Sequence, residues 1–517
     1  MTSDNLEFMN TPSSYWIDST PWTDYPKLEN DIEVDVAIVG GGLVGITSAF
    51  LLKQEGFKVA VVEADKILQG TTGHSTAKIT SQHSLIYARL KKEMGEELSQ
   101  QYAEANEKAI HMIASIAKEN KIDCDFTWRP AYVYTQSEQY LQDIEDEARA
   151  ASSLGIKASY LDDSPLPFPV KAALCFQDQA QFHPLKYLKA LAAKISGQGS
   201  HIFEETAALD IQKDPSAVIT RNGKKIKAAK IIIASHFPFF DGGGMYFAKM
   251  YVEKSYIIGI KINEKFPEGM FITAESPGRS LRSQNDGNEE LVLIAGEHHK
   301  TGDGQNLNIH YQNLLDFAHQ TFQVNEVKYR WSTQDCMTID GVPYCGNITP
   351  KNPDLYVATG FGKWGISNGT ATAMVMRDLI SKGDSPWAPV YNPSRFNLKS
   401  TKTFLVQNLD VAKEYISGKF AAIPNDVEMP KGEARVVDVD GLRFGGYRDD
   451  QGDLHLVDIT CTHLGCELKW NNAELSWDCP CHGSRFSVDG EIIEGPAFNY
   501  LQNPGQCQNQ VEVRAFE

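Results

Sequence analysis

The chain has 517 residues, 42% of them hydrophobic, so it can bury a large core and form about two or three domains. Its formal net charge of -18 at pH 7 argues against nucleic acid or an anionic membrane as a partner, because phosphate-rich surfaces repel an acidic protein. No apolar stretch is long enough to span a bilayer, and the N-terminal segment does not resemble a secretory signal. The cytoplasm is therefore the expected location.

The first motif lies between Val34 and Glu63, a segment that reads as strand, glycine turn, helix and strand. Gly40, Gly42 and Gly45 fall in the turn, where they permit a tight bend and close approach of a pyrophosphate to the helix N-terminus. Glu63 ends the second strand and can accept a hydrogen bond from a ribose hydroxyl. This pattern predicts a bound dinucleotide, but it does not specify which one.

The rest of the chain divides into two unequal parts. Apolar residues at roughly helical spacing predict one long amphipathic helix over 85–121. Short strands and helices follow, and a run rich in Pro, Ser and Asn begins at Gly383. The tail after this run is rich in predicted strands. We expect an N-terminal domain at 31–383, a linker at 384–420 and a C-terminal domain at 421–517.

The C-terminal part holds the strongest motif, and four of the nine cysteines cluster there. A Cys-x-His pair, Cys461 and His463, precedes a Cys-x-x-His pair, Cys479 and His482. Two thiolates on one iron and two imidazoles on the other are the ligands of a Rieske [2Fe-2S] centre. A structural zinc site has the same ligand types, and the spacing alone permits it. Each loop also has a second cysteine that could clamp the loops together and a glycine that lets the backbone close tightly, which favours the iron-sulfur cluster.

The loops CTHLGC and CPCHGS closely resemble the cluster loops of the Rieske proteins of cytochrome bc complexes. The resemblance implies an all-β domain, a [2Fe-2S] cluster and a disulfide between Cys466 and Cys481. A cytoplasmic disulfide departs from the usual compartment rule, but burial beside the cluster could protect it. In bc-type proteins the serine of CPCHGS and a tyrosine two residues later donate hydrogen bonds to sulfur. Ser484 is present here, but Phe486 replaces the tyrosine, so we expect a potential below that of bc-type centres.

Several segments that follow the dinucleotide motif resemble the D-amino-acid oxidase superfamily of flavoproteins. They are DQAQFHPLKYLKAL (178–191), AKIIIAS (229–235), and TIDGVPYCG followed by DLYVATGFGKWGISNG (338–369). The resemblance implies FAD as the dinucleotide, an α/β Rossmann-like FAD-binding domain and a mixed α+β substrate domain. It also places Gly360, Gly362 and Gly365 near the flavin ring. An ordinary turn is the alternative, but the preceding strand LYVAT and the helix that follows favour the flavin.

The loop GTTGHSTAK (70–78) resembles a segment that passes the edge of the flavin in some relatives. His74 falls where certain dimethylglycine and sarcosine dehydrogenases carry a flavin bound covalently to histidine. Most members of the superfamily bind FAD without such a bond, so both states remain open. His298 and His299 end the predicted strand LVLIAGEHH, where they either face the substrate or form an ordinary polar strand end.

One departure from the superfamily bears on the substrate. Relatives that oxidise α-amino acids commonly have Arg-Pro just before the Thr-x-Asp-Gly segment, because a guanidinium binds a carboxylate in bidentate fashion. Asp335 and Cys336 occupy these positions here. A carboxylate at this place would attract a cation and repel an amino-acid carboxylate. The sequence therefore favours an amine or a related substrate.

These features predict an FAD-dependent dehydrogenase fused to a Rieske domain, which resembles the FAD/Rieske fusion oxidoreductases of bacteria. FAD would take two electrons from a small-molecule substrate, and the cluster would pass them singly to an external redox protein or a quinone. No residue stands out as a general base. A Rieske oxygenase would need a mononuclear iron site, and no convincing ligand spacing for it is present. A redox sensor without substrate turnover remains the alternative function.

Overall fold

The computed structural model describes residues 12–304, 306–395, 406–411, 413–415, 429–439 and 442–504. The dinucleotide motif forms the centre of an eight-stranded sheet, in which β1 pairs in parallel with β2 and with β12, β2 with β9, and β12 with β19. The predicted strand, turn, helix and strand are thus confirmed. The elements are β1 (Ile32–Val39), α2 (Leu43–Gln54), β2 (Val59–Val62), β9 (His201–Phe203), β10 (Ala208–Lys213), β11 (Ser216–Thr220), β12 (Lys225–Ile233), β18 (Tyr344–Asn347) and β19 (Leu355–Thr359).

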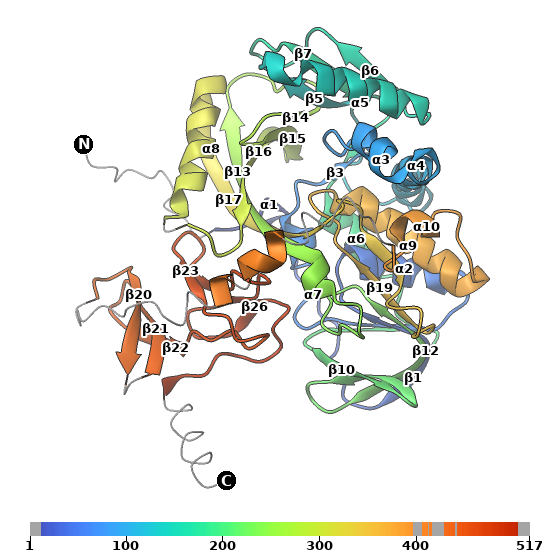
Figure 1. The fold of residues 1–517 in the computed structure, drawn as a ribbon, viewed down its shortest axis with the longest axis vertical. Helices are drawn as coiled ribbons and strands as arrows, with labels where there is room; N and C mark the ends of the chain where they lie inside the picture. Colours follow the sequence, from blue (N-terminus) through green and yellow to red (C-terminus); the bar gives the residue numbers. More distant parts are fainter. Residues whose placement is uncertain are drawn as a thin grey trace.

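A second eight-stranded sheet lies above the first in Figure 1, with strand order β17-β13-β16-β15-β14-β5-β7-β6. Its neighbouring strands are antiparallel except β14 and β5. Helices α5 and α8 pack on this sheet, in agreement with the expected mixed α+β domain. The strands are β5 (Ala131–Thr135), β6 (Ala158–Leu161), β7 (Ala172–Phe176), β13 (Met250–Ile262), β14 (Met270–Thr273), β15 (Arg279–Asp286), β16 (Glu289–Lys300) and β17 (Val324–Thr338). A small third sheet joins β3 (Lys78–Ile79), β8 (Ala180–Gln181) and β4 (Thr127–Trp128).

The expected single helix over 85–121 is wrong, because the segment forms two helices that meet at Gly95. Gly95 has φ +86°, a left-handed conformation that interrupts the helical hydrogen bonds. The helices and 3-10 turns are α1 (Tyr15–Asp18), η1 (Thr71–His74), α3 (Tyr87–Met94), α4 (Glu96–Glu119), η2 (Glu138–Tyr140), α5 (Leu141–Ser153), α6 (Pro184–Ala192), α7 (Tyr246–Lys249), α8 (Asn308–Thr321), α9 (Gly365–Lys382) and α10 (Ala388–Tyr391).

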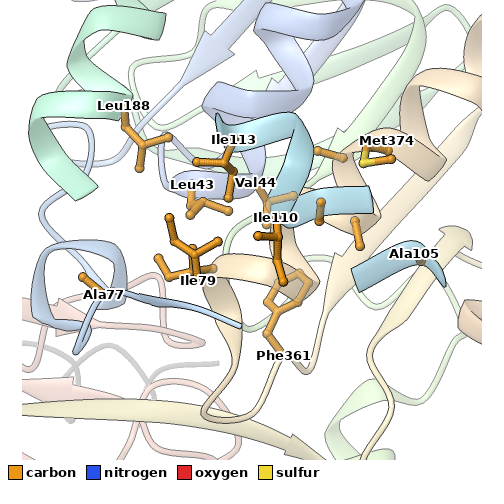
Figure 2. Packing of buried hydrophobic residues seen from close by; sticks show 14 of the residues in the cluster. Leu43, Val44, Ala77, Ile79, Ala105, Ile110, Ile113, Leu188, Phe361 and Met374 are labelled. Atoms are coloured by element: carbon orange, nitrogen blue, oxygen red, sulfur yellow. The ribbon is translucent and has the colours of Figure 1, made fainter. Parts of the chain in front are cut away.

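The main core surrounds α2, which is buried from Leu43 to Leu52. A helix that is apolar all round must be covered on every side, and here the sheet, α4 and α9 cover it. Figure 2 shows Val44 of α2 close to Ile110 and Ile113 of α4. α9 crosses α2 at Gly369, where a Cβ would lie 2.6 Å from the Leu43 side chain. This crossing fixes the position of α9, the helix that follows Gly360 and Gly362.

The C-terminal domain is all-β, as expected, and consists of a three-stranded and a four-stranded sheet (Figure 1). Within the expected linker at 384–420, residues 396–405, 412 and 416–420 lie outside the described residues, as does the expected start of the domain at 421. The described part of the linker holds α10 and a helical stretch at 406–411. The strands are β20 (Ala434–Val439), β21 (Leu442–Arg448), β22 (Leu454–Asp458), β23 (Lys469–Asn471), β24 (Ser476–Asp478), β25 (Arg485–Phe486) and β26 (Ile492–Glu494). Within the described part of the chain, no helix combines the length and apolarity needed to cross a membrane.

Candidate flavin and iron-sulfur sites

The glycines of the dinucleotide motif lie where β1 ends and α2 begins. Gly40 has φ +109°, and a Cβ there would clash with the carbonyl oxygen of Ala234. A Cβ on Gly45 would clash with the backbone oxygen of Gly40, so neither position tolerates a side chain. Gly42 differs, because the atom that a Cβ there would approach is the Thr72 hydroxyl, at 3.2 Å. The space beside Gly42 therefore fits a pyrophosphate.

The N-terminus of α2 and Glu63 form the polar part of this site. Gly42 has no side chain that could cap α2, and the Thr72 hydroxyl accepts from the N–H of Leu43 at 3.0 Å, so the other N–H groups at the positive end of the helix can face a phosphate. The Glu63 carboxylate accepts hydrogen bonds from the N–H groups of Gly41 at 2.7 Å and Asp65 at 3.3 Å. Burial raises the pKa of Glu63, while these N–H groups oppose the shift. The carboxylate lies against the glycine turn, where the motif places a ribose.

The second glycine segment, from Gly360 to Gly365, joins β19 to α9 and lies against the end of β17. Gly360 has φ +75°, and a Cβ there would clash with the side chain of Thr338. The N–H of Gly362 donates to the carbonyl of Cys336 at 3.0 Å. The positive end of α9 lies at this segment and can stabilise negative charge on a bound group. These features fit the flavin position that the resemblance implies.

His74 lies at the end of η1, within the electrostatic reach of the Rieske domain. Its Nδ1 donates to the carbonyl of Gly70 at 2.9 Å, and its own carbonyl accepts from Nε1 of Trp331 at 2.8 Å. Burial lowers the pKa of His74, whereas Glu474 and Glu494 act in the opposite direction. A neutral imidazole is compatible with a free or an attached flavin, so covalent attachment stays a prediction.

Asp335 lies on β17 and pairs across the strands with Glu253 of β13. Lys363, in the second glycine segment, forms an ion pair with Glu253 in which Nζ and Oε2 lie 3.0 Å apart. Burial raises the pKa of Asp335 to about 7, and Lys363 opposes the shift. His298 is exposed overall, but partial desolvation of its ring lowers its pKa. The charge of Lys363 lowers this pKa further, and that of Glu253 raises it. We call Glu253, His298, Asp335 and Lys363 the Asp335 site.

His299 points to the opposite face of the sheet from His298. Its Nε2 hydrogen-bonds with the hydroxyl of Tyr256 at 3.0 Å, and its ring stacks on His310 of α8 with centroids 4.6 Å apart. Burial and the neighbouring His310 lower its pKa to about 4. His298 and Asp335 thus share Lys363 and Glu253 as charged neighbours, whereas His299 lies in a packed stack beneath α8.

The histidines of the Rieske motif lie side by side, with ring centroids 5.0 Å apart. The Nδ1 atoms of His463 and His482 are both buried, and neither has a hydrogen-bond partner among the residues that the structure describes. Burial lowers their pKa values to about 4 for His463 and about 3 for His482, so both rings are neutral at pH 7. Two neutral imidazoles with unpaired, buried nitrogens are suited to bind one iron.

The two motif thiols lie within hydrogen-bonding distance of each other beside these rings. Hydrogen bonds from Cys479, from the N–H of His463 and from the hydroxyl of Ser484 lower the pKa of Cys461 to about 7 although burial opposes them. The N–H groups of His482 and Cys481 point at the sulfur of Cys479. Such donors stabilise thiolate and sulfide charge, so the pocket fits a [2Fe-2S] cluster.

Cys466 and Cys481 form the disulfide that the resemblance implies. Their sulfurs and that of Cys479 all lie within 4.8 Å of one another, and all three residues are buried. The disulfide thus joins the two ligand loops directly beside one ligand cysteine. Burial shields this disulfide from reductants in solution.

Two residues that touch the Rieske domain were missed at the level of sequence. Phe237 follows β12, and its ring centroid lies 6.2 Å from His463 and 6.3 Å from His482. Lys254 of β13 is fully buried and pairs with Asp478 at 3.4 Å. A lysine inside the apolar run of β13 was a possible signal, whereas Phe237 had none, since buried aromatic residues are common.

The region 35–379 matches the family model described as FAD dependent oxidoreductase, and 419–505 matches that of the Rieske [2Fe-2S] domain. The chain belongs to the FAD-dependent oxidoreductase family. The oxidoreductase carries the Rieske domain at its C-terminal end, so both resemblances seen in the sequence are confirmed. Its cofactors are FAD and a [2Fe-2S] cluster, which decides against the zinc alternative.

Known proteins resemble either the whole oxidoreductase or its larger part. YhfW of Bacillus subtilis, named as a Rieske 2Fe-2S iron-sulfur protein, is 44% identical over 95% of this chain and 97% of its own. Gamma-glutamylputrescine oxidoreductase of Escherichia coli is 23% identical over 73% of this chain and 90% of its own. The crystal structure of glycine oxidase from Geobacillus kaustophilus has the same fold, with a TM-score of 0.60 at 20% identity over 71% of this chain and 99% of that one.

Proposed function

We propose that this oxidoreductase is a dehydrogenase that oxidises a small cationic amine and passes the electrons singly through its cluster to an external redox protein or quinone in the cytoplasm. FAD supplies a two-electron acceptor for the C–H bond next to nitrogen, and the [2Fe-2S] cluster supplies a one-electron carrier. In this proposal Gly40, Gly42, Gly45 and Glu63 hold the dinucleotide. Cys461, His463, Cys479 and His482 hold the cluster.

The position of Phe237 is the observation that carries the relay. This residue follows β12, whose end packs against the glycine turn of the FAD site, and its ring contacts both histidines of the Rieske motif. The cluster pocket is therefore in contact with the flavin-binding domain. A Rieske domain that worked independently of the flavin would not need its two motif histidines to be packed against the flavin-binding domain.

The Asp335 site supports an amine as the substrate. Asp335 and Glu253 place two carboxylates on one face, and Lys363 compensates one of them. The remaining negative charge favours an ammonium group over the carboxylate of an α-amino acid. E. coli gamma-glutamylputrescine oxidoreductase bears the name of an amine substrate, which agrees with this direction. Asp335 would orient the amine, and His298 would line the entrance.

Anaerobic mixing with an amine panel tests the proposal. Diamines, benzylamine, sarcosine and glycine are each added to the holoenzyme, and the flavin and cluster bands are followed separately. We expect cationic amines to bleach the flavin first and the cluster afterwards, with repeated turnover once ferricyanide is supplied. A sensor would bleach with dithionite but would turn over none of these compounds, and that result would replace the proposal by the alternative function.

A further inference from the structure

Gln334 of β17 connects the two domains through its side chain. Its Nε2 donates to the carbonyl of Gly483, in the second loop of the Rieske motif, at 2.8 Å. Its Oε1 accepts from the hydroxyl of Thr301 at 2.8 Å. Gln334 is 3% exposed, so this amide is buried and held from both ends. Burying an amide is costly unless it is paired, and here the pairing crosses the domain boundary.

The loop that Gln334 holds is also packed closely against the larger domain. A Cβ on Gly483 would lie 2.8 Å from the Val252 side chain of β13. A Cβ on Gly302 would lie 2.8 Å from Pro480, so the loop after β16 touches the same ligand loop. No gap is left for a water-filled joint at these points. The loop from Cys479 to Ser484 therefore has one position against the sheet.

The backbone of Gln334 faces the flavin side of the same junction. Its carbonyl accepts from the Thr71 hydroxyl at 3.1 Å and from Nε2 of His236 at 3.1 Å. Thr71 precedes the Thr72 that lies beside Gly42, and His236 follows β12. Two residues further along β17, Cys336 binds the second glycine segment. One short piece of strand thus touches both cofactor sites.

We propose that Gln334 is a positioning residue that holds the cluster-binding loop against the flavin-binding domain and so sets the rate of electron transfer between the two cofactors. The inference rests on the proposed function, because it assumes that electrons pass from FAD to the cluster. Gln334 touches neither cofactor's predicted ligands itself. Its role is to keep the ligand loop at a fixed place relative to β17.

The test compares Gln334→Met with Asn472→Ala in the holoprotein. Methionine has a similar shape but cannot donate to Gly483. Asn472 accepts from the N–H of Leu307 at 2.8 Å and donates to Oδ1 of Asn306 at 3.0 Å, so its variant removes two other hydrogen bonds between the domains, away from the ligand loop. Amide exchange of the 479–484 peptide is measured by mass spectrometry. Cluster reduction is timed after a light pulse reduces the flavin in the presence of EDTA, so no substrate is required.

In Gln334→Met we expect the amide hydrogens of the 479–484 peptide to exchange about tenfold faster, a factor that corresponds to about 1.4 kcal/mol. Cluster reduction should be several-fold slower in the same variant. Asn472→Ala should match the wild type in both measurements. Wild-type rates in Gln334→Met, or an equal effect of Asn472→Ala, would overturn the inference. If the methionine variant does not load its cluster, Thr301→Val, which frees one end of the amide, should show the same two changes in weaker form. A wild type that never reduces its cluster would instead refute the proposed function.

Discussion

At the scale of single residues, Ser484 is the group that tunes the cluster most directly. Its hydroxyl donates to the sulfur of Cys461, and the reduced, more negative cluster gains more from such a donor than the oxidised one. Ser484→Ala should therefore lower the reduction potential, by about 40 mV for a hydrogen bond of about 1 kcal/mol. Redox titration of the cluster's electron-paramagnetic signal measures the shift.

Phe486 provides the complementary variant. It is fully buried in the same small core as the ligand cysteines, where the bc-type resemblance places a tyrosine. Phe486→Tyr should raise the potential by a similar amount if the new hydroxyl faces a ligand sulfur. An unchanged or lower potential would show that this ring points elsewhere.

Asp335 predicts the pH dependence of substrate binding. Burial raises its pKa to about 7, so the carboxyl is neutral below this pH and anionic above it. An aliphatic amine stays cationic throughout, and its affinity should therefore rise about tenfold between about pH 6 and pH 8. Flavin reduction at varied amine concentration gives the dissociation constant. In Asp335→Asn this rise should disappear, and a rise that persists in the variant would exclude Asp335 as its cause.

Neighbouring residues show what the sequence could and could not predict at this scale. The Cys-x-His and Cys-x-x-His motifs and the missing Arg-Pro were readable because the members of each lie close together in the chain. The different directions of His298 and His299 were not, because facing depends on the register of β16 against β13. Lys363 lies in the segment DLYVATGFGKWGISNG, but its pairing with Glu253 depends on how β13 is placed against this segment in the fold.

At the scale of elements, the glycine turn makes a prediction that separates packing from binding. Gly45→Ala would press a Cβ onto the Gly40 backbone, so we expect a distorted turn and almost complete loss of FAD. Gly42→Ala would approach only the Thr72 hydroxyl, at 3.2 Å, and a small shift of this side chain relieves the contact, so the apoprotein should stay folded. The variant should nevertheless weaken FAD binding, because the methyl group enters the phosphate space. Flavin absorbance of the purified variants and their thermal unfolding distinguish the two effects. Equal FAD content in Gly42→Ala and the wild type would contradict the assigned pyrophosphate position.

Helices and strands were predictable where one pattern dominated the segment. Apolar strands flank the glycines of the turn after β1, and this unit has the expected structure. The break between α3 and α4 was missed because apolar spacing continues across Gly95, and only the left-handed backbone there reveals the stop. Periodicity reports the buried face of a segment and is insensitive to a single residue that interrupts it.

At the scale of the whole molecule, the buried Lys254–Asp478 pair joins the domains. Burial alone would raise the pKa of Asp478, but Lys254 and Arg485 lower it. Lys254→Met leaves a buried carboxylate with one cation fewer, so it should destabilise the docked domain by about 3 kcal/mol. Thermal loss of the cluster's visible circular dichroism measures this change. Lys261→Met is the control, because its partner Glu289 is 62% exposed and its second carboxylate, Asp286, lies 3.9 Å away, so these surface pairs should contribute less than about 1 kcal/mol.

The existence of two domains was predictable, whereas their junction was not. Each domain carries its own local motifs, which identify it independently of the other. Gln334 of β17 and Gly483 of the loop between β24 and β25, by contrast, are 149 residues apart, so no local pattern relates them. A buried glutamine in a strand becomes informative only when the residue facing it is known.

The alternating side-chain directions along β17 restrict where the chain can accept insertions and deletions. Gln334 and Asp335 face opposite sides because adjacent strand residues alternate, so a one-residue insertion directly before them, within the regular part of the pairing, would exchange an amide and a carboxylate between the two sites. The pairing of β13 with β17 is regular from Met250 to Gly259, and its irregularities fall after Gly259, at the far end. Homologues should therefore accept odd-numbered insertions or deletions at that far end, and near Gln334 only in even steps.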